Sequence, residues 1–397
     1  MKTPHATIGR LTVVGALTAA LVTAIVPGPA AQANEPTGSV LNAGGATAVA
    51  DRYIVVFKDG ESAPSDVGAR ARDLATRHGG SVGFTYTVAL RGFEAKVGAD
   101  AAARIAADPS VAYVEQVHTV RALGTQPNPP SWGLDRIDQD DLPLDNSFTF
   151  RNTASAVHAY IIDTGIRFSH ETFGGRAITG IDVINGGTAD DCNGHGTHVA
   201  GTVGGTEYGV AKEVTLVAVR VLGCLGFGST AGVIEGIDWV TQNAKRPAVA
   251  NMSLGGSAST AMDAAVRRSI ASGVSYAIAA GNSDADACTQ SPARVGEAMT
   301  VGASTITDAR ASFSNFGTCL DLFAPGEDIT SAWKASDTAT NTISGTSMAA
   351  PHVAGAAALV LHVRPDLSPL KVRNHLVNQS AANRLSDVGA GSPNRLL

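Results

Sequence analysis

The chain has 397 residues, of which 44% are apolar and 16% charged, and it has a formal net charge of −6 and a pI near 5.9. This acidic balance excludes the broad basic surface with which nucleic-acid-binding proteins attract phosphates. The 44 glycines are typical of a fold with many tight turns.

Residues 1–33 have the pattern of a secretory signal peptide. Lys2 and Arg10 provide the positive start, residues 11–26 form an uncharged and mostly apolar run, and Ala-Gln-Ala at 31–33 is a small-x-small cleavage site. A membrane anchor is the alternative, but sixteen residues that include three threonines and a glycine make a poor span. We therefore predict a secreted, extracellular protein whose mature form has no membrane association.

A small domain is predicted next, between residues 34 and 123. Residues 34–50 are rich in Gly, Ala and Thr, which is the composition of a linker. The pattern then predicts a strand at 53–58, a helix at 64–78, strands at 82–90 and 93–97, a helix at 99–107 and a strand at 111–117. This β-α-β-β-α-β order indicates a ferredoxin-like α+β domain. The polar, proline-rich stretch 122–130 that follows predicts an exposed junction open to proteolysis.

Residues 124–397 predict a larger α/β domain. Near-continuous apolar runs predict strands at 157–162, 215–221, 249–254, 274–280 and 299–303. Between them lie helical patterns such as 229–243, where Val233, Ile234, Ile237 and Val240 share one face. Buried strands that alternate with helices favour a mostly parallel central sheet with helices on both faces.

Three polar positions in this domain suggest nucleophilic catalysis. Asp163 follows an apolar strand, and His195 lies in a glycine-flanked turn before a small-residue helix. Ser347 precedes the apolar run 353–363, so we expect it at a helix start, where free N–H groups favour negative charge. A helix cap is the alternative for Ser347 alone, but the order Asp, His, Ser is that of the subtilisin triad.

The sequence around these positions resembles the subtilisin-like serine proteases, the peptidase S8 family. Three blocks carry the resemblance: Asp163-Thr164-Gly165, His195-Gly196-Thr197-His198 and Gly345-Thr346-Ser347-Met348-Ala349. The proteinase K branch, with its secreted aqualysin-type bacterial enzymes, is the most similar, and the match extends over residues 132–397. The resemblance implies a three-layer subtilisin-like fold.

The segment before residue 124 resembles the inhibitor I9-type propeptide of these proteases. The resemblance implies a precursor whose propeptide assists folding, blocks the cleft and is removed near Gly124 by the enzyme itself. A permanent accessory domain is the alternative. Protein and peptide substrates and the enzyme's own propeptide are the implied partners, and we expect a monomer.

The resemblance also implies the roles of individual residues. Ser347 is the expected nucleophile, His195 the general base, Asp163 its orienting acid and Asn282 a donor to the oxyanion, with no cofactor for catalysis. Three segments are expected to bind substrate: Ser253-Leu254-Gly255 and Ala279-Ala280-Gly281 around the primary specificity pocket, and Gly226-Phe227-Gly228 beside an extended peptide. These walls favour an apolar or aromatic residue before the cut and otherwise broad specificity. Phe227 departs from the small residue expected there.

Four cysteines in a secreted chain suggest two disulfides, and sequence alone leaves three pairings open. Metal binding is the alternative, although the chain has no Cys-x-x-Cys pair. The resemblance implies the pairs Cys192–Cys224 and Cys288–Cys319.

Two structural calcium sites are implied in the same way, since hard oxygen ligands suit Ca²⁺. The first combines the carbonyl groups of Gly296 and Ala298 with Asp321. The second is an oxygen-rich loop made of Asp135, Asp138, Gln139 and Asp145. An acidic turn that is merely solvated is the alternative for this loop.

Two other functions remain open at this point. His195 and His198 lie three residues apart, a spacing compatible with zinc ligands on one helix face, but no H-E-x-x-H glutamate accompanies them and no third ligand is evident. We therefore interpret His198 and His352 as structural. A secreted binding protein on an inactive protease scaffold is the non-enzymatic alternative.

Overall fold

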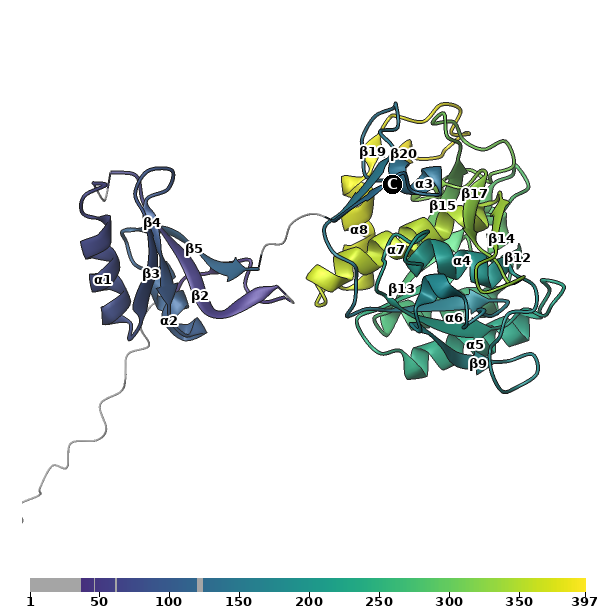
Figure 1. The fold of residues 1–397 in the computed structure, drawn as a ribbon, viewed down its shortest axis with the longest axis horizontal. Helices are drawn as coiled ribbons and strands as arrows, with labels where there is room; N and C mark the ends of the chain where they lie inside the picture. The colour runs from purple at the N-terminus through teal and green to yellow at the C-terminus, as the bar shows by residue number, and fades with distance from the viewer. Residues whose placement is uncertain (1–36, 46, 61–62, 120–123) are drawn as a thin grey trace, which may run out of the picture. The chain divides into compact units, whose positions relative to one another are not determined.

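The computed structural model describes residues 37–45, 47–60, 63–119 and 124–397. They divide into two compact units, a smaller one that contains Val55–Val114 and a larger one that contains Glu115–Leu397 together with residues 40–54. Residues 40–54 nevertheless pair within the five-stranded sheet of the N-terminal fold, so the N-terminal and C-terminal folds that Figure 1 draws are each described by themselves. The predicted signal peptide lies outside the described residues.

The N-terminal fold is a five-stranded sheet with two helices. Its elements are β1 (Val40–Leu41), β2 (Ala48–Phe57), α1 (Val67–Arg77), β3 (Ser81–Tyr86), β4 (Gly92–Lys96), α2 (Ala99–Ala106) and β5 (Val111–His118). The strand order is β1-β5-β2-β4-β3, so β2 to β5 have the ferredoxin-like arrangement that the sequence predicts. Val55, Leu74, Phe93 and Ile105 are fully or almost fully buried in its core.

Two expectations for this region were wrong. Residues 34–50 are not all linker, because β1 lies within them and β2 begins at Ala48. The strand expected to reach residue 90 ends at Tyr86. In both cases hydrogen-bonded pairing with neighbouring strands, rather than local composition, sets where the extended backbone begins and ends.

The C-terminal fold is built on a nine-stranded sheet in the order β19-β20-β16-β15-β13-β11-β8-β10-β9. The strands are β8 (His158–Asp163), β9 (Ala177–Asp182), β10 (Thr215–Arg220), β11 (Ala248–Met252), β13 (Ser275–Ala279), β15 (Met299–Ser304), β16 (Leu322–Pro325), β19 (Ala381–Ala382) and β20 (Arg395–Leu396). All neighbours are parallel except β19 and β20. The predicted strands are therefore confirmed, with ends that differ by one or two residues.

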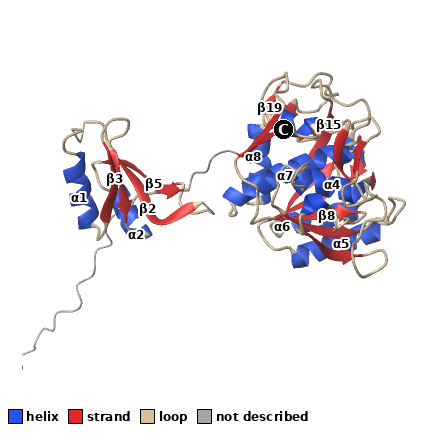
Figure 2. Cartoon of the chain, in the orientation of Figure 1, coloured by secondary structure: helices blue, strands red, loops and turns tan. Residues whose placement is uncertain are grey.

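Helices cover both faces of this sheet, as Figure 2 shows. The main ones are α4 (His195–Gly204), α5 (Thr230–Asn243), α6 (Thr260–Ala271), α7 (Thr346–Val363) and α8 (Pro369–Gln379). Alternate residues of β8 separate the two faces: Ala159 and Ile161 pack with α4, α7 and α8, whereas Tyr160 and Ile162 pack with α5 and α6. This three-layer α/β architecture is the one expected from the buried strands.

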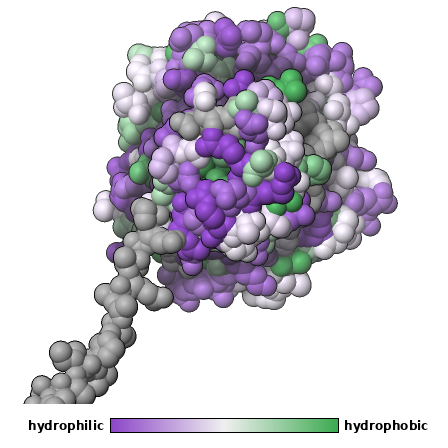
Figure 3. Space-filling view, turned by 90° about the vertical axis from the view of Figure 1, so that its left-hand side faces the viewer, coloured by the Kyte–Doolittle hydropathy of each residue, from purple (hydrophilic) through white to green (hydrophobic). Residues whose placement is uncertain are grey.

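Smaller elements complete this fold. They are β6 (Gly124–Pro127), α3 (Trp132–Arg136), β7 (Ser147–Phe150), η1 (Glu171–Phe173), β12 (Gly256–Ser257), η2 (Ala287–Thr289), β14 (Gln290–Ser291), β17 (Ile329–Ala332) and β18 (Thr340–Ile343). Figure 3 views the chain from the side on which Figure 1 draws the N-terminal fold, and the surface in view is largely hydrophilic, with only small separate apolar areas. Within the described residues, α7 alone is long and apolar enough to cross a membrane, but 67% of it is buried, as in the core helix of a globular domain.

Candidate active site

Asp163 is the last residue of β8, a central strand of the sheet, and its side chain is fully buried. Its carboxylate accepts a hydrogen bond from the backbone N–H of Thr164 at 2.7 Å. Because β8 is paired with β10 as far as Asp163 itself, the position of this carboxylate is fixed by the sheet.

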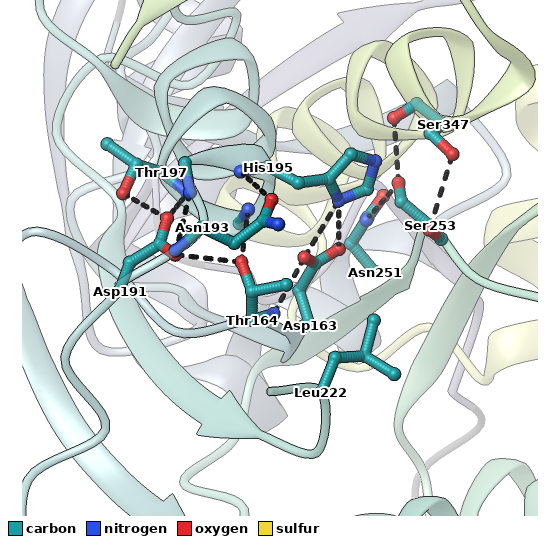
Figure 4. A network of polar contacts seen from close by, with 12 residues as sticks. Asp163, Thr164, Asp191, Asn193, His195, Thr197, Leu222, Asn251, Ser253 and Ser347 are labelled. Carbon is teal, nitrogen blue, oxygen red and sulfur yellow. Dashed lines mark hydrogen bonds and ion pairs between the residues drawn. The ribbon is translucent and has the colours of Figure 1, made fainter. Parts of the chain in front are cut away.

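His195 begins α4 directly after a turn that only glycine fits. Gly194 has a φ of +114°, and a Cβ there would lie 2.6 Å from the Trp333 ring. The ring Nδ1 of His195 lies 2.8 and 3.0 Å from the two oxygens of Asp163 (Figure 4). The Nδ1–H therefore donates to the carboxylate, which leaves Nε2 of the neutral ring as an acceptor.

The electrostatics of this pair favour the protonated ring. Burial lowers the pKa of His195, but the charge of Asp163, its hydrogen bond and the charge of Asp191 outweigh that effect and raise the pKa above 6.5. The His195 side chain remains 25% exposed, so one edge of the ring is accessible to a ligand.

Asp191 holds the turns that carry Asp163 and His195 together, a role that sequence reasoning missed. One carboxylate oxygen accepts from the backbone N–H of Asn193 and Gly194 and from the Thr164 hydroxyl, at 2.8–2.9 Å. The other accepts from the N–H and hydroxyl of Thr197 at 2.9 and 2.6 Å. An Asp shortly before a helix start was the available signal, because such residues bond nearby backbone N–H groups.

Ser347 is the second residue of α7, which confirms its expected place at a helix start. Its Oγ donates to the carbonyl of Ser253 at 3.3 Å, and the Ser253 hydroxyl donates back to the Ser347 carbonyl at 2.7 Å. No hydrogen bond joins Ser347 to His195 among the described residues, although Figure 4 shows the second ring nitrogen on the side that faces Ser347. Catalytic hydrogen bonds often tighten only when substrate binds.

Asn282 is held in one orientation by Thr346. Its Oδ1 accepts from both the backbone N–H and the hydroxyl of Thr346, each at 2.8 Å. The Thr346 hydroxyl in turn accepts from the N–H of Gly281 at 3.0 Å. With its oxygen engaged in this way, the exposed Asn282 amide presents its NH₂ group as a donor.

A cleft of about 740 Å³ is lined by His195 and by residues that follow the carboxyl ends of β8, β10 and β11. Of the expected substrate segments, it is lined by Gly226, Phe227, Gly228, Ser253, Leu254 and Gly255. Ala279, Ala280 and Gly281 do not line it, and the first two are buried. The lining also includes Leu222, Val233 and Met262, which the sequence did not indicate as substrate-binding residues because they are ordinary apolar residues of helices and loops.

The two predicted calcium sites differ in how well their residues suit a cation. One oxygen of Asp321 is paired with Arg373 at 2.6 Å, and the other accepts from the N–H of Thr300 at 2.8 Å. A calcium ion bound by Asp321 and the carbonyl groups of Gly296 and Ala298 would compete with the Arg373 guanidinium for the Asp321 carboxylate. The first site therefore fits only if Arg373 moves.

The second predicted site has free acceptors. Asp138 Oδ1 and Gln139 Oε1 are buried without a hydrogen-bond partner, an arrangement that a cation would satisfy. Asp135, by contrast, uses both oxygens to accept from the N–H groups of Asp145 and Asn146. No three His, Cys, Asp or Glu side chains in the described ranges are grouped to hold a metal, so amide and carbonyl oxygens would complete this shell.

His198 and His352 are buried core residues. His198 Nε2 donates to the carbonyl of Ile329 at 2.9 Å, and His352 Nδ1 donates to that of Met348 at 2.8 Å. Burial lowers the pKa of each to about 4. Both rings are therefore neutral at physiological pH, in agreement with a structural role.

The structure contains both disulfides in the pairing that the resemblance implied. Cys192 is bonded to Cys224, with a Cα–Cα distance of 4.9 Å, and Cys288 to Cys319, with 5.4 Å. The first joins the turn before His195 to the segment that lines the cleft.

Comparison with known proteins finds matches to two family models and to characterised relatives. Residues 156–395 match the family model "Subtilase family", and residues 52–123 match "Peptidase inhibitor I9". The chain is 54% identical over 368 residues to the "Extracellular serine proteinase" of Thermus sp. (strain Rt41A), covering 88% of this chain and 90% of the relative. It is 49% identical to "Alkaline serine exoprotease A" of Vibrio alginolyticus, covering 88% of this chain and 67% of the relative.

Among solved structures, that of a cold adapted subtilisin-like serine proteinase matches with a TM-score of 0.65 and 57% sequence identity, covering 67% of this chain and 97% of the other. The subtilase match covers more than half of the chain, and the fold described above is that of the family. The chain therefore belongs to the subtilase family of serine proteinases and carries an I9-type propeptide before its peptidase domain.

Proposed function

We propose that this subtilase is a secreted endopeptidase in which Asp163, His195 and Ser347 form the catalytic triad. The contact of His195 Nδ1 with both oxygens of Asp163 carries this proposal, because it orients the ring with a free basic nitrogen toward the serine. A serine hydroxyl is a weak nucleophile unless a base of this kind is positioned beside it.

In this mechanism Ser347 Oγ leaves the Ser253 carbonyl and attacks the carbonyl carbon of the peptide bond. His195 Nε2 takes the hydroxyl proton and then delivers it to the leaving amine as the C–N bond breaks. Water repeats the sequence and releases the acyl group. The raised pKa of His195 supports this role, since Asp163 stabilises the imidazolium that forms at each step.

The negative oxygen of the tetrahedral intermediate would be bound by two donors. One is the Asn282 NH₂ group, which the contacts with Thr346 leave unused. The other is the backbone N–H of Ser347 at the start of α7, where the helix dipole adds a favourable field.

Substrate specificity would follow from the cleft. Gly226–Gly228 and Ser253–Gly255 offer backbone groups along which an extended peptide can add as a strand. Main-chain pairing carries little side-chain information, so specificity should be broad, with an apolar or aromatic residue before the cut.

The chain would be made as an autoprocessed precursor. We assign residues 1–33 to a signal peptide, 34–123 to a linker and inhibitory propeptide, and 124–397 to the peptidase domain. The inhibitor-type match over residues 52–123 supports the middle assignment, and the extracellular relative from Thermus supports secretion.

We also propose structural calcium. The unpartnered oxygens of Asp138 and Gln139, with Asp135 of α3 and Asp145 close in sequence, would hold the ion at the end of α3 and in the loop after it. The Asp321 site remains a second proposal, on the condition that its Arg373 partner moves aside. No catalytic step depends on either ion, which would act by stabilising the folded state.

The test compares the purified precursor with its Ser347→Ala variant, using Ser65→Ala, at an exposed serine of the N-terminal fold, as the control. Wild type and Ser65→Ala should digest casein, shorten to the peptidase domain and react with a fluorophosphonate at Ser347. Ser347→Ala should do none of these. Metal-dependent hydrolysis without fluorophosphonate reaction would indicate a zinc hydrolase instead, and an unreactive wild type would indicate an inactive scaffold.

A further inference from the structure

Asn251 places an amide side chain in the apolar centre of the sheet. It belongs to β11, where it lies opposite Ile161 of β8 and Ala277 of β13, and only 1% of its surface is exposed. The other residues of β11 are apolar, as is usual for a strand buried on both faces. Its Oδ1 is buried and has no hydrogen-bond partner among the described residues, so the amide is held there at a cost in free energy. A buried amide that is only half satisfied needs an explanation other than packing.

The donor half of this amide is bonded to Ser253. Asn251 Nδ2 donates to Ser253 Oγ at 2.8 Å, and the Ser253 hydroxyl donates to the Ser347 carbonyl at 2.7 Å (Figure 4). Because the single hydroxyl proton of Ser253 is used on Ser347, Ser253 Oγ can only accept from Asn251. The amide of Asn251 therefore fixes the direction of the Ser253 O–H bond, and hydrogen bonds linked in this way strengthen one another.

The Ser347 carbonyl needs this bond because its regular helical donor is missing. In an α-helix the carbonyl of residue 347 would accept from the N–H of residue 351, four positions later. That residue is Pro351, which has no N–H. The Ser253 hydroxyl takes the place of the missing donor. Ser347 Oγ in turn donates to the Ser253 carbonyl at 3.3 Å, so two hydrogen bonds of opposite direction hold the serine.

We propose that Asn251 is a positioning residue for the nucleophile, which acts through Ser253 to hold the backbone of Ser347 in the geometry needed for attack. The inference rests on the proposed function and adds a residue that is not part of the cleft lining. A misplacement of about 1 Å at a reacting group can cost about a hundred-fold in rate. Loss of the Asn251 amide should therefore act on kcat rather than on substrate binding.

The experiment measures kcat and KM on one peptide substrate for wild type, Asn251→Leu, Ser253→Ala and the Asn251→Leu/Ser253→Ala double variant. Leucine keeps the branching of the asparagine side chain and removes the amide. The control is Tyr276→Phe in the neighbouring strand β13, which also removes one buried hydrogen bond, to Ser269 of α6. Titration with a fluorophosphonate fixes the concentration of active enzyme, so that unfolded protein is not counted as a low kcat.

Asn251→Leu should lower kcat and the rate of the fluorophosphonate reaction roughly three- to ten-fold, about the effect of one lost hydrogen bond, and leave KM nearly unchanged. Ser253→Ala should lower kcat at least as much, and Asn251→Leu should have almost no further effect in that background. Tyr276→Phe should lower Tm and keep the wild-type kcat.

A wild-type kcat in folded Asn251→Leu, or an equal loss of kcat with and without the Ser253 hydroxyl, would overturn the role of Asn251 alone. If Asn251→Leu does not fold, Asn251→Ala replaces it with the same expected results, since alanine already occupies two positions of β11. A wild type that cuts no peptide and does not react with a fluorophosphonate would overturn the proposed function as well.

Discussion

Thr346 offers a direct test of how this protein prepares its proposed oxyanion donor. Its hydroxyl donates to Asn282 Oδ1 at 2.8 Å and accepts from Gly281 N–H at 3.0 Å, while its backbone N–H makes a second bond to the same Oδ1. Thr346 is fully buried, so Thr346→Val keeps the shape of the side chain and removes only the hydroxyl. We expect the variant to lower kcat and to leave KM nearly unchanged.

The magnitude follows from the two bonds that orient the amide. Removal of one of these hydrogen bonds weakens the preference for the productive amide orientation by about 1 kcal/mol, so the population of that orientation relative to the others falls roughly five-fold. The upper limit is the loss of the whole donor, about 10²–10³ in kcat for the corresponding Asn of subtilisin. The Gly281 N–H also loses its partner, so unfolding should become easier by about 1–3 kcal/mol.

The assay measures kcat and KM on a peptide substrate for wild type, Thr346→Val, Thr346→Ser, Asn282→Ala and the Thr346→Val/Asn282→Ala double variant. Thr346→Ser restores the hydroxyl and should recover most of the rate. If Thr346 acts through Asn282, Thr346→Val should have almost no further effect on kcat once Asn282 is Ala. An equal loss of kcat in both backgrounds, or an effect confined to KM, would refute this reasoning.

Three further predictions concern the Asp163–His195 pair, the Cys192–Cys224 disulfide and the proposed calcium ion. Asp163→Asn should lower kcat by about 10⁴, the loss known for the corresponding change in the trypsin triad. Since Asp163 raises the pKa of His195, the acid limb of the pH profile of kcat/KM should also move to lower pH in this variant. An acid limb that stays at the wild-type pH would contradict the assignment. Replacement of Cys192 and Cys224 together by Ser should raise KM more than it lowers kcat, because the bridge positions the cleft-lining turn rather than the triad. Steady-state kinetics in which kcat falls by the same factor as KM rises would contradict this prediction. EGTA should leave initial rates near normal but shorten the half-life of activity on heating. Asp138→Asn should reproduce part of that loss of half-life. If EGTA instead stops catalysis at once while the protein remains folded, the metal takes part in catalysis.

Much of the fold could be predicted from local pattern. The strand and helix order of both domains follows from apolar periodicity, and the N-cap Ser229 of α5 falls where the predicted helix begins. The prediction was weakest where strand pairing sets the extent of a strand, as at β1 and the start of β2. The backbone groups there bond to a neighbouring strand that is distant in sequence, which local pattern does not reveal.

The sequence by itself determined the candidate catalytic groups, since Asp163, His195 and Ser347 stand in short blocks whose composition suits a strand end and two helix starts. Only the tertiary structure decided what supports them. Asp191 joins the Asp163 and His195 turns, and Thr346 orients Asn282 from a segment 64 residues away. The physical reason is that a hydrogen bond requires two groups about 3 Å apart, and folding, rather than spacing along the chain, brings such groups together.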